Sequence, residues 1–154
     1  KGKDVKAVLA KLYPKFEEEK FLQMCERYQI PLDKFLKEYS TGMKAKLNLI
    51  IALTHQADFL MLDEPTTGLD PEGMYYVRKS MRDLVERGKS IILVTHYPED
   101  IIPEIERVVM IKEGKLFDDG RKEELLTSKR MSELFNVPLR IIEQDGYFSL
   151  VSEY

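Results

Sequence analysis

Apolar positions in the first forty residues recur with the period of an α-helix. In the first segment they fall at positions i, i+3, i+4 and i+7: Val5, Val8, Leu9 and Leu12. This spacing predicts a helix that ends near Pro14. The same spacing returns between Glu17 and Tyr28, and Pro31 then opens a passage rich in turn residues. We therefore expect a small layer of short helices, each with one apolar face.

The middle of the chain alternates longer helical patterns with short, continuously apolar runs. Ser40 is a good N-cap for a helix that reaches about His55, and residues 59–62 then form an apolar run typical of a buried strand. Pro71 suits the first turn of a helix that continues to Gly88. Residues 90–96 form a second, β-branched run of the kind found in parallel sheets.

The last third of the chain reads as short helices and two hairpins. A helix is expected over roughly residues 98–105. A strand, a Glu113-Gly114 turn and a return strand follow over residues 107–118. Short helices are expected around residues 122–126 and 132–135. A final hairpin pairs residues 139–143 with residues 147–151 across Asp145-Gly146, a strong two-residue turn signal.

This order of elements predicts an α/β fold. Strand, helix, strand, helix, strand implies a central parallel sheet, to which the N-terminal helices and the C-terminal hairpin are added. We expect three parts: a helical subdomain over residues 1–38, a core over residues 39–126 and a tail with the hairpin over residues 127–154.

Composition narrows the class of protein. The 154 residues suffice for one domain with its own core, and a net charge of −3 argues against a dedicated nucleic-acid binder. Cys25 is the single cysteine, which excludes an internal disulfide and suits a small core residue in a reducing compartment. No apolar run approaches the roughly 18 residues that span a bilayer, and no signal peptide is expected. A membrane role would therefore come through a partner.

Two adjacent acids close the first apolar run and carry the clearest chemistry. Phosphoryl transfer needs a magnesium ion on the phosphate oxygens, a positioned water and groups that stabilise developing charge. Asp63, at the strand end, suits the metal, and Glu64 suits polarising or deprotonating the attacking water. The simpler alternative is that the two acids are solvated and merely end the strand.

Two other positions could serve the same reaction. His96 closes the second strand and could reach the same sheet edge, where it would contact a γ-phosphate; a lone histidine is otherwise structural. The segment Ser40-Thr41-Gly42 starts a helix, so its amides, its hydroxyl and the positive helix end could bind an anion. The alternative for this segment is an ordinary helix cap.

The chain lacks the loop that normally holds the phosphates beside such acids. Gly88-Lys89-Ser90 looks like the end of one, but Asp83 stands where the first glycine is needed, and the tripeptide opens a strand rather than a helix. Gly68 and Gly73 have the glycine spacing, but Met74 replaces the lysine.

Taken in order, the motifs resemble those of the ATP-binding-cassette (ABC) ATPases over nearly the whole chain. They are Tyr39-Ser40-Thr41-Gly42-Met43, Leu60-Met61-Leu62-Asp63-Glu64-Pro65, Gly68-Leu69-Asp70-Pro71 and Thr95-His96. The resemblance implies that Asp63 is the Walker B acid that supports Mg²⁺, Glu64 the catalytic base and His96 the switch histidine. It also implies that Asp70 is the D-loop residue at a dimer interface, and that Ser40, Thr41 and Gly42 contact ATP held by the opposite subunit.

The chain departs from the family pattern in two places. The signature differs from the usual Leu-Ser-Gly-Gly-Gln at Tyr39, Thr41 and Met43, so Thr41 adds a side chain near the phosphate path. The adenine-stacking aromatic, the Walker A loop and the Q-loop, which lie upstream in the family, are missing. The resemblance thus implies a partial P-loop NTPase-type sheet without its Walker A strand. It also implies that the chain alone is inactive. The chain would be a piece of a longer protein or, as the alternative, be completed by another polypeptide.

The resemblance further implies ATP and Mg²⁺ as cofactors. The implied partners are a second ATPase subunit and a transmembrane transporter subunit, and no nucleic acid is expected. The protein would lie at the cytoplasmic face of a membrane. The motif Tyr13-Pro14-Lys15-Phe16 is similar to exporter ATPases and the tail to iron-complex importers, so the direction of transport stays open.

Two alternatives remain: the C-terminal lobe of an SMC-like chromosome-maintenance ATPase, and a soluble ABC ATPase without a membrane partner. Short helices broken at Pro14 and Pro31 argue against the former.

Overall fold

The computed structural model describes residues 1–152 and divides the chain into two compact units. The first unit is Lys1–Val94 and the second is Thr95–Tyr154, of which residues 95–152 are described. Each unit is considered by itself. The division expected from the sequence, with boundaries after residues 38 and 126, stays a prediction.

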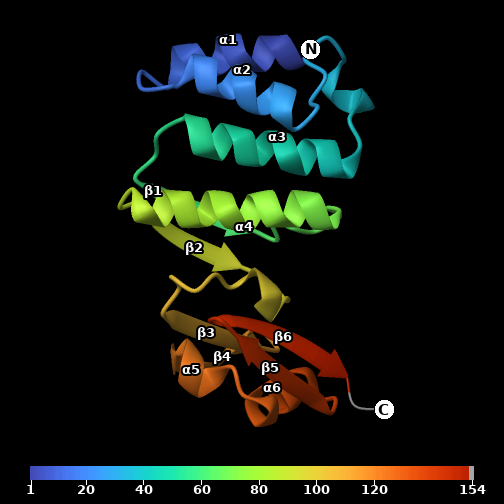
Figure 1. Cartoon of the computed structure of the whole chain (residues 1–154), viewed down its shortest axis with the longest axis vertical. Coiled ribbons are helices and arrows are strands. Elements are labelled where there is room, and N and C mark those ends of the chain that lie inside the picture. Colours follow the sequence, from blue (N-terminus) through green and yellow to red (C-terminus); the bar gives the residue numbers. More distant parts are fainter. Residues whose placement is uncertain (153–154) are drawn as a thin grey trace. The chain divides into compact units, whose positions relative to one another are not determined.

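The first unit begins with three helices close to the predicted ones. They are α1 (Gly2–Leu12), α2 (Glu18–Arg27) and α3 (Thr41–Thr54), with a single 3₁₀ turn, η1 (Leu36–Glu38), before α3. Ser40 is the N-cap of α3, as predicted: its Oγ accepts a hydrogen bond from the Met43 amide at 3.2 Å. Figure 1 shows α1 and α2 side by side, with α3 packed beneath them.

The apolar faces of these helices form one core. Phe21 and Ile50 are fully buried in it, and Phe16 stacks at a tilt on Phe21 with ring centroids 5.5 Å apart. Cys25 is also buried, as predicted, and burial raises the pKa of its thiol to about 11. The thiol therefore stays protonated at neutral pH and acts as a small core side chain.

Two parallel strands complete the first unit. They are β1 (Phe59–Asp63) and β2 (Ser90–Val94), joined through helix α4 (Pro71–Glu86), and Leu60 pairs with Ile91 in their register. This confirms the predicted parallel strand–helix–strand unit. Helix α4 packs against β2 on one side and α3 on the other (Figure 1). Strand β2 is shorter than predicted, since it ends at Val94 rather than at His96.

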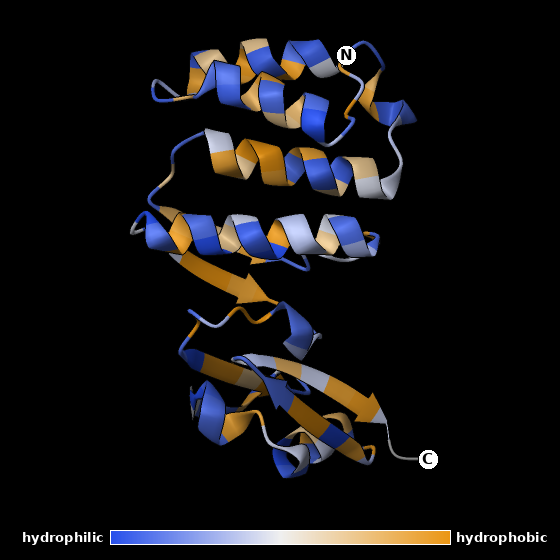
Figure 2. Cartoon of the chain, viewed as in Figure 1, coloured by the Kyte–Doolittle hydropathy of each residue, from blue (hydrophilic) through white to orange (hydrophobic). Residues whose placement is uncertain are grey.

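One face of this two-stranded sheet is apolar and exposed. The side chains of Phe59, Met61, Ile92 and Val94 are between 44% and 64% exposed, whereas Leu60 and Leu62, which alternate with them on β1, are buried. Figure 2 shows the apolar character of β2 along its length. Parallel strands normally lie inside an α/β protein with both faces covered. The sequence of this sheet is therefore suited to a fully buried position.

The N-terminus of α4 is capped by Asp70, which the sequence assigned only to an interface. Its Oδ1 accepts a hydrogen bond from the Gly73 amide at 2.7 Å, and Pro71 follows at the first helical position. A side chain at Gly73 would bring its Cβ within 2.9 Å of that same oxygen, so glycine allows the tight cap.

Replacing Asp70 with alanine is expected to lower the free energy of unfolding by about 1 kcal/mol, because the Gly73 amide loses its acceptor. Asp70→Asn keeps a side-chain oxygen at this position and is the matched control. Urea unfolding of the three proteins measures the difference. Equal midpoints for the wild-type protein and Asp70→Ala would show that the cap contributes nothing.

The second unit is built from two hairpins and short helices. Its elements are η2 (Pro98–Asp100), β3 (Arg107–Lys112), β4 (Lys115–Arg121), α5 (Lys122–Leu125), α6 (Ser128–Phe135), β5 (Leu139–Gln144) and β6 (Tyr147–Ser152). Both predicted hairpins are present, with positive φ angles at Glu113-Gly114 and at Asp145-Gly146. Helix α6 begins four residues before the predicted start.

The helix predicted over residues 98–105 is wrong. Only the three-residue turn η2 forms there. Pro103 disfavours a helical conformation at the residue before it, and Ile101 and Ile102 instead bury their side chains in a non-helical segment. The apolar side chains of this segment thus belong to a buried loop.

The core of the second unit lies beneath its two hairpins. It includes Ile102, Met110, Met131 and Phe148, all at most 5% exposed. The opposite side of the first hairpin exposes apolar side chains, because Val109, Ile111 and Leu116 are 54–68% exposed. This hairpin thus resembles the parallel strands of the first unit in having one uncovered apolar face.

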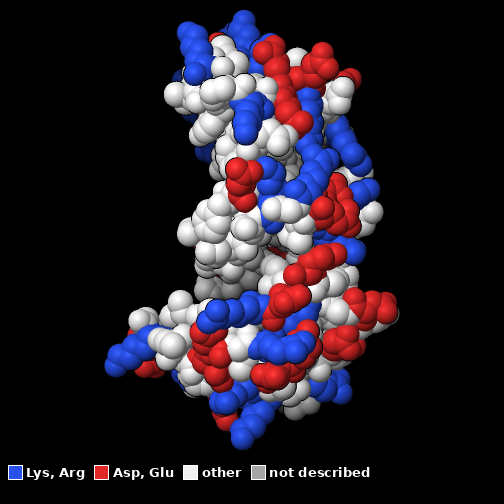
Figure 3. All heavy atoms as spheres, turned by 90° about the vertical axis from the view of Figure 1, so that its left-hand side faces the viewer, with Lys and Arg blue, Asp and Glu red and all other residues white. Residues whose placement is uncertain are grey.

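In Figure 3, acidic and basic side chains are mixed where charge occurs on the visible face, and part of that face carries no charge. Within residues 1–152, no helix is both long and apolar enough to cross a membrane.

Candidate functional site

The two predicted acids lie at the carboxyl end of β1. Asp63 is the last residue of the strand and is exposed, while Glu64 is half-buried. The Glu64 amide donates a hydrogen bond to the Val94 carbonyl at 2.9 Å, which extends the β1–β2 pairing by one residue. Glu64 has a φ of +47°, a region that costs energy for a residue with a Cβ. The backbone thus turns sharply at the residue predicted to be the catalytic base.

Thr67 holds the Glu64 side chain and was not foreseen from the sequence. Its Oγ1 donates a hydrogen bond to Oε2 of Glu64 at 3.0 Å, and its amide donates to the Glu64 carbonyl at 3.1 Å. A threonine three residues after an acid in a turn is a local signal for such a bond. The hydroxyl therefore orients the carboxylate.

The turn after Glu64 leads to the capped start of α4. Leu69 donates its amide to the Thr66 carbonyl at 3.1 Å, and Gly68 has a φ of +74°, where a residue with a Cβ would be strained. The segment ends at Asp70, the N-cap of α4. One tight turn therefore connects the acid pair to Asp70.

The start of α3 lies against this turn. A Cβ added at Gly42 would come within 3.3 Å of the Gly68 carbonyl oxygen, so a side chain there would require the turn to shift by a few tenths of an ångström. Ser40 and Thr41 are exposed on the same helix start. Asp63, Glu64, Asp70 and the segment Ser40–Gly42 all belong to the first unit, and within it the segment 40–42 is brought against the turn between the acids and Asp70.

Tyr39, which departs from the usual leucine, is a core residue. It is 3% exposed in the cluster of the first three helices, and its hydroxyl donates a hydrogen bond to the Pro31 carbonyl at 2.7 Å. Tyrosine thus keeps the apolar burial that leucine would supply and adds one satisfied polar contact. The exposed part of the motif begins at Ser40.

His96 lies in the second unit, two residues beyond the end of β2, and is exposed. Hydrogen bonds on either side of it shape its loop. The Tyr97 amide donates to Thr95 Oγ1 at 3.0 Å, and Thr95 Oγ1 donates to Asp100 Oδ2 at 3.1 Å. Asp100 is fully buried, so a polar side chain deep in the unit anchors the loop that carries the histidine.

The acids can support a metal only as part of a larger coordination shell. Among residues 1–152, no group of three or more histidine, cysteine, aspartate or glutamate side chains could hold a metal ion. A single exposed carboxylate such as Asp63 suits Mg²⁺, which keeps several waters and binds mainly to substrate phosphates. The residues present fit such a shared site and do not fit a metal held by the protein alone.

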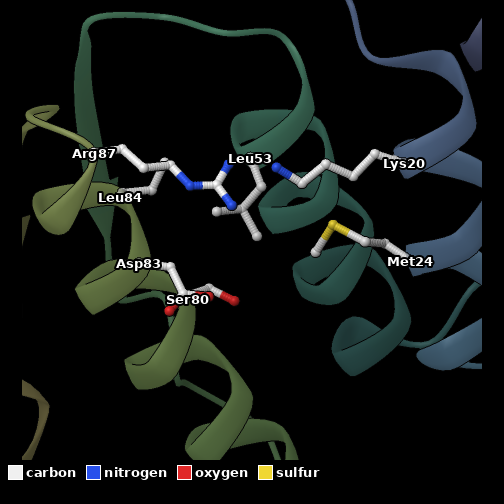
Figure 4. Close-up of a pocket in the computed structure, with 7 residues that line it drawn as sticks. All are labelled: Lys20, Met24, Leu53, Ser80, Asp83, Leu84 and Arg87. Atoms are coloured by element: carbon white, nitrogen blue, oxygen red, sulfur yellow. The ribbon is translucent and has the colours of Figure 1, made fainter.

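The cavity in Figure 4 lies apart from these residues, between α2, α3 and α4. Its volume is about 50 Å³, and Lys20, Asp83 and Arg87 bring charge to its edge. None of the predicted site residues lines it. A space of this size holds one or two waters, whereas ligand pockets measure several hundred Å³.

Comparison with known families finds a match over residues 15–99, more than half of the chain. The family is described as "AAA domain, putative AbiEii toxin, Type IV TA system". The matched segment contains both acids, the segment Ser40–Gly42, Asp70 and His96.

Curated relatives carry the name "Nod factor export ATP-binding protein I". That of Paraburkholderia xenovorans is 38% identical over 103 residues, or 67% of this chain and 34% of its own length. That of Rhizobium etli is 36% identical over 100 residues, or 65% of this chain and 32% of its own. The chain thus spans about a third of the length of the curated relatives it matches. The solved structure "Structure of ATP binding subunit of ABC transporter" matches 89% of this chain and 57% of its own with a TM-score of 0.71, at 21% identity.

Proposed function

Because this chain belongs to the AAA-domain family and is similar to ATP-binding subunits of ABC transporters, we propose that it forms the catalytic end of an ATP-hydrolysing ABC subunit. The observation that carries the proposal is the conformation of Glu64. Its strained backbone is tied to β2, and its carboxylate is held by Thr67 directly after an exposed acid. A group that must be aimed at a water molecule needs this kind of restraint.

The acids at the end of β1 have separate roles in this proposal. Asp63 supports Mg²⁺, directly or through water, and the ion when bound neutralises charge on the β- and γ-phosphates of ATP. Glu64 accepts the proton of the attacking water. The hydrogen bond from Thr67 to Oε2 restrains this carboxylate. His96 contacts the γ-phosphate and stabilises its developing charge.

The start of α3 serves a second nucleotide. Ser40, Thr41 and Gly42 offer a hydroxyl and backbone amides at the positive end of a fourteen-residue helix, which favours a phosphate held by the opposite subunit. Asp70 lies at the interface between the subunits. Its cap fixes the start of α4 directly after the turn of residues 64–70.

The assembly we propose has two ATPase subunits and a transmembrane subunit, with the ATPase at the cytoplasmic face of the membrane. Closure of the ATPase dimer on ATP and reopening after hydrolysis would drive transport by the membrane subunit. The relatives are named for export, which favours export over import for this chain as well. The exporter-like motif Tyr13-Pro14-Lys15-Phe16 is consistent with that direction.

Phosphate release by the full-length protein tests the proposed function. We expect turnover with Mg²⁺, its loss when EDTA removes the metal, and no stimulation by double-stranded DNA. The metal dependence follows because a cation must neutralise the phosphate charge, and Asp63, itself an acid, can only help to hold that cation. Stimulation by DNA would instead favour the chromosome-maintenance class, and absence of turnover with Mg²⁺ would contradict the proposal. Purification from detergent extracts provides a second measurement, since a transporter ATPase should bring a membrane subunit with it.

A further inference from the structure

The loop that carries His96 is held by contacts of its own residues. We refer to Thr95–Asp100 as the histidine loop. Besides the hydrogen bonds that link Thr95 to Tyr97 and Asp100, the Asp100 amide donates to the Tyr97 carbonyl at 3.0 Å. The buried Asp100 carboxylate closes one end of this loop. A loop closed in this way presents His96 in a restricted set of positions.

The C-terminal hairpin, β5–β6, holds the same loop from outside. The Leu150 amide of β6 donates a hydrogen bond to Oε1 of Glu99 at 2.9 Å, 51 residues away in the sequence. Glu99 lies in η2, directly before Asp100, and η2 packs against β6 (Figure 1). An amide on the outer edge of a hairpin needs a partner or exposure to water, and here Glu99 supplies the partner.

Packing also joins the C-terminal hairpin to the segment that follows the histidine loop. Phe148 of β6 and Ile102 are both buried in the core of the second unit. At the tip of the hairpin, a Cβ added at Gly146 would come within 3.2 Å of the Pro103 Cβ, so the turn lies directly on the segment after the histidine loop. Lys122, itself buried, donates from Nζ to the Pro103 carbonyl and secures the same segment from α5.

We propose that the C-terminal hairpin is a positioning device for His96, acting through Glu99. The inference rests on the proposed function, since it needs His96 to take part in hydrolysis. The hairpin touches no reacting atom, and its role is to keep the histidine loop in the conformation that serves the γ-phosphate. A partner that pulls the hairpin away from Glu99 would therefore slow hydrolysis without touching the nucleotide.

The test is a double-mutant cycle in the full-length protein, with kcat and KM for ATP as readouts. Glu99→Leu removes the acceptor and should lower kcat about ten- to hundredfold with KM little changed, as expected for a misplaced catalytic group. Glu99→Gln keeps a carbonyl oxygen and should stay within about twofold of the wild-type protein. In the background of His96→Ala, Glu99→Leu should cause no further loss, because it acts through the missing histidine.

Hydrogen exchange of the same proteins supplies a readout that does not depend on activity. Glu99→Leu should speed amide exchange over residues 95–102 and at Leu150, and leave residues 107–121 unchanged. Unchanged exchange over residues 95–102 would overturn the proposal, as would an equal loss of kcat from Glu99→Leu with and without His96. A normal kcat in Glu99→Leu, together with a lowered kcat in His96→Ala, would overturn only the positioning role of the hairpin. Full activity of His96→Ala would overturn the role of His96 itself.

Discussion

Glu64→Gln in the full-length protein is expected to lower kcat for ATP hydrolysis by at least about a hundredfold, the usual contribution of a general base. Glutamine keeps the size and the hydrogen-bond acceptor of glutamate, so Thr67 can still hold the side chain in place. It cannot accept a proton from the attacking water. ATP binding should stay near the wild-type level, because in the proposed mechanism Glu64 acts on the water rather than on the nucleotide.

The measurement combines phosphate release with equilibrium binding of labelled ATP. Glu72→Gln is the matched control, since Glu72 is an exposed acid in the first turn of α4 and carries no proposed role. This variant should hydrolyse ATP at the wild-type rate. Unchanged turnover in Glu64→Gln would remove Glu64 from the role of base, whereas loss of both turnover and ATP binding would indicate a structural role.

The 154-residue chain alone is expected neither to bind ATP tightly nor to hydrolyse it. Its sequence contains no glycine-rich loop with a lysine to hold the phosphates, so the acids have no positioned substrate. Its β1–β2 sheet exposes apolar side chains on one face, as does the first hairpin of the second unit. Parallel strands of this composition are normally covered. The chain alone therefore lacks both a phosphate-binding loop and the partner that would cover its sheet.

Calorimetric titration with ATP and phosphate release by the purified chain measure this directly, with the full-length protein as the positive control. The Glu64→Gln form of the isolated chain is a second control, because a contaminating ATPase would be indifferent to it. Turnover by the wild-type chain that Glu64→Gln abolishes would contradict the prediction. Such a result would mean that these residues assemble a working site without a phosphate-binding loop.

Local signals predicted most of the elements. The Ser40 cap and the helix that follows depend on one side chain and the amides next to it, and the two hairpin turns depend on residues that accept positive φ angles. Strands β1 and β2 come from short apolar runs, and their parallel pairing follows from the helix between them. In each case the information lies within a few residues of the element.

The predictions failed where distant packing decided the conformation. Residues 98–105 have apolar spacing that suits a helix, yet Pro103 and the burial of Ile102 hold them in a loop. The cap role of Asp70 is an exception, because it is a local contact with the Gly73 amide that the sequence analysis did not predict. The hydrogen bond between Leu150 and Glu99 joins residues 51 positions apart, which no local pattern can indicate.

The sequence by itself predicted the kind of chemistry that we propose, because the order of the acid pair, the Ser-Thr-Gly helix start, Asp70 and His96 is a property of the chain. It also showed that the phosphate-binding loop is missing. Only the tertiary structure decided how the residues are held: the strained turn at Glu64, the grip of Thr67, the contact of Gly42 with Gly68 and the anchoring of the histidine loop by β6. The physical reason is that residue type sets what a side chain can do, whereas its direction depends on hydrogen bonds and packing between segments that only folding brings together.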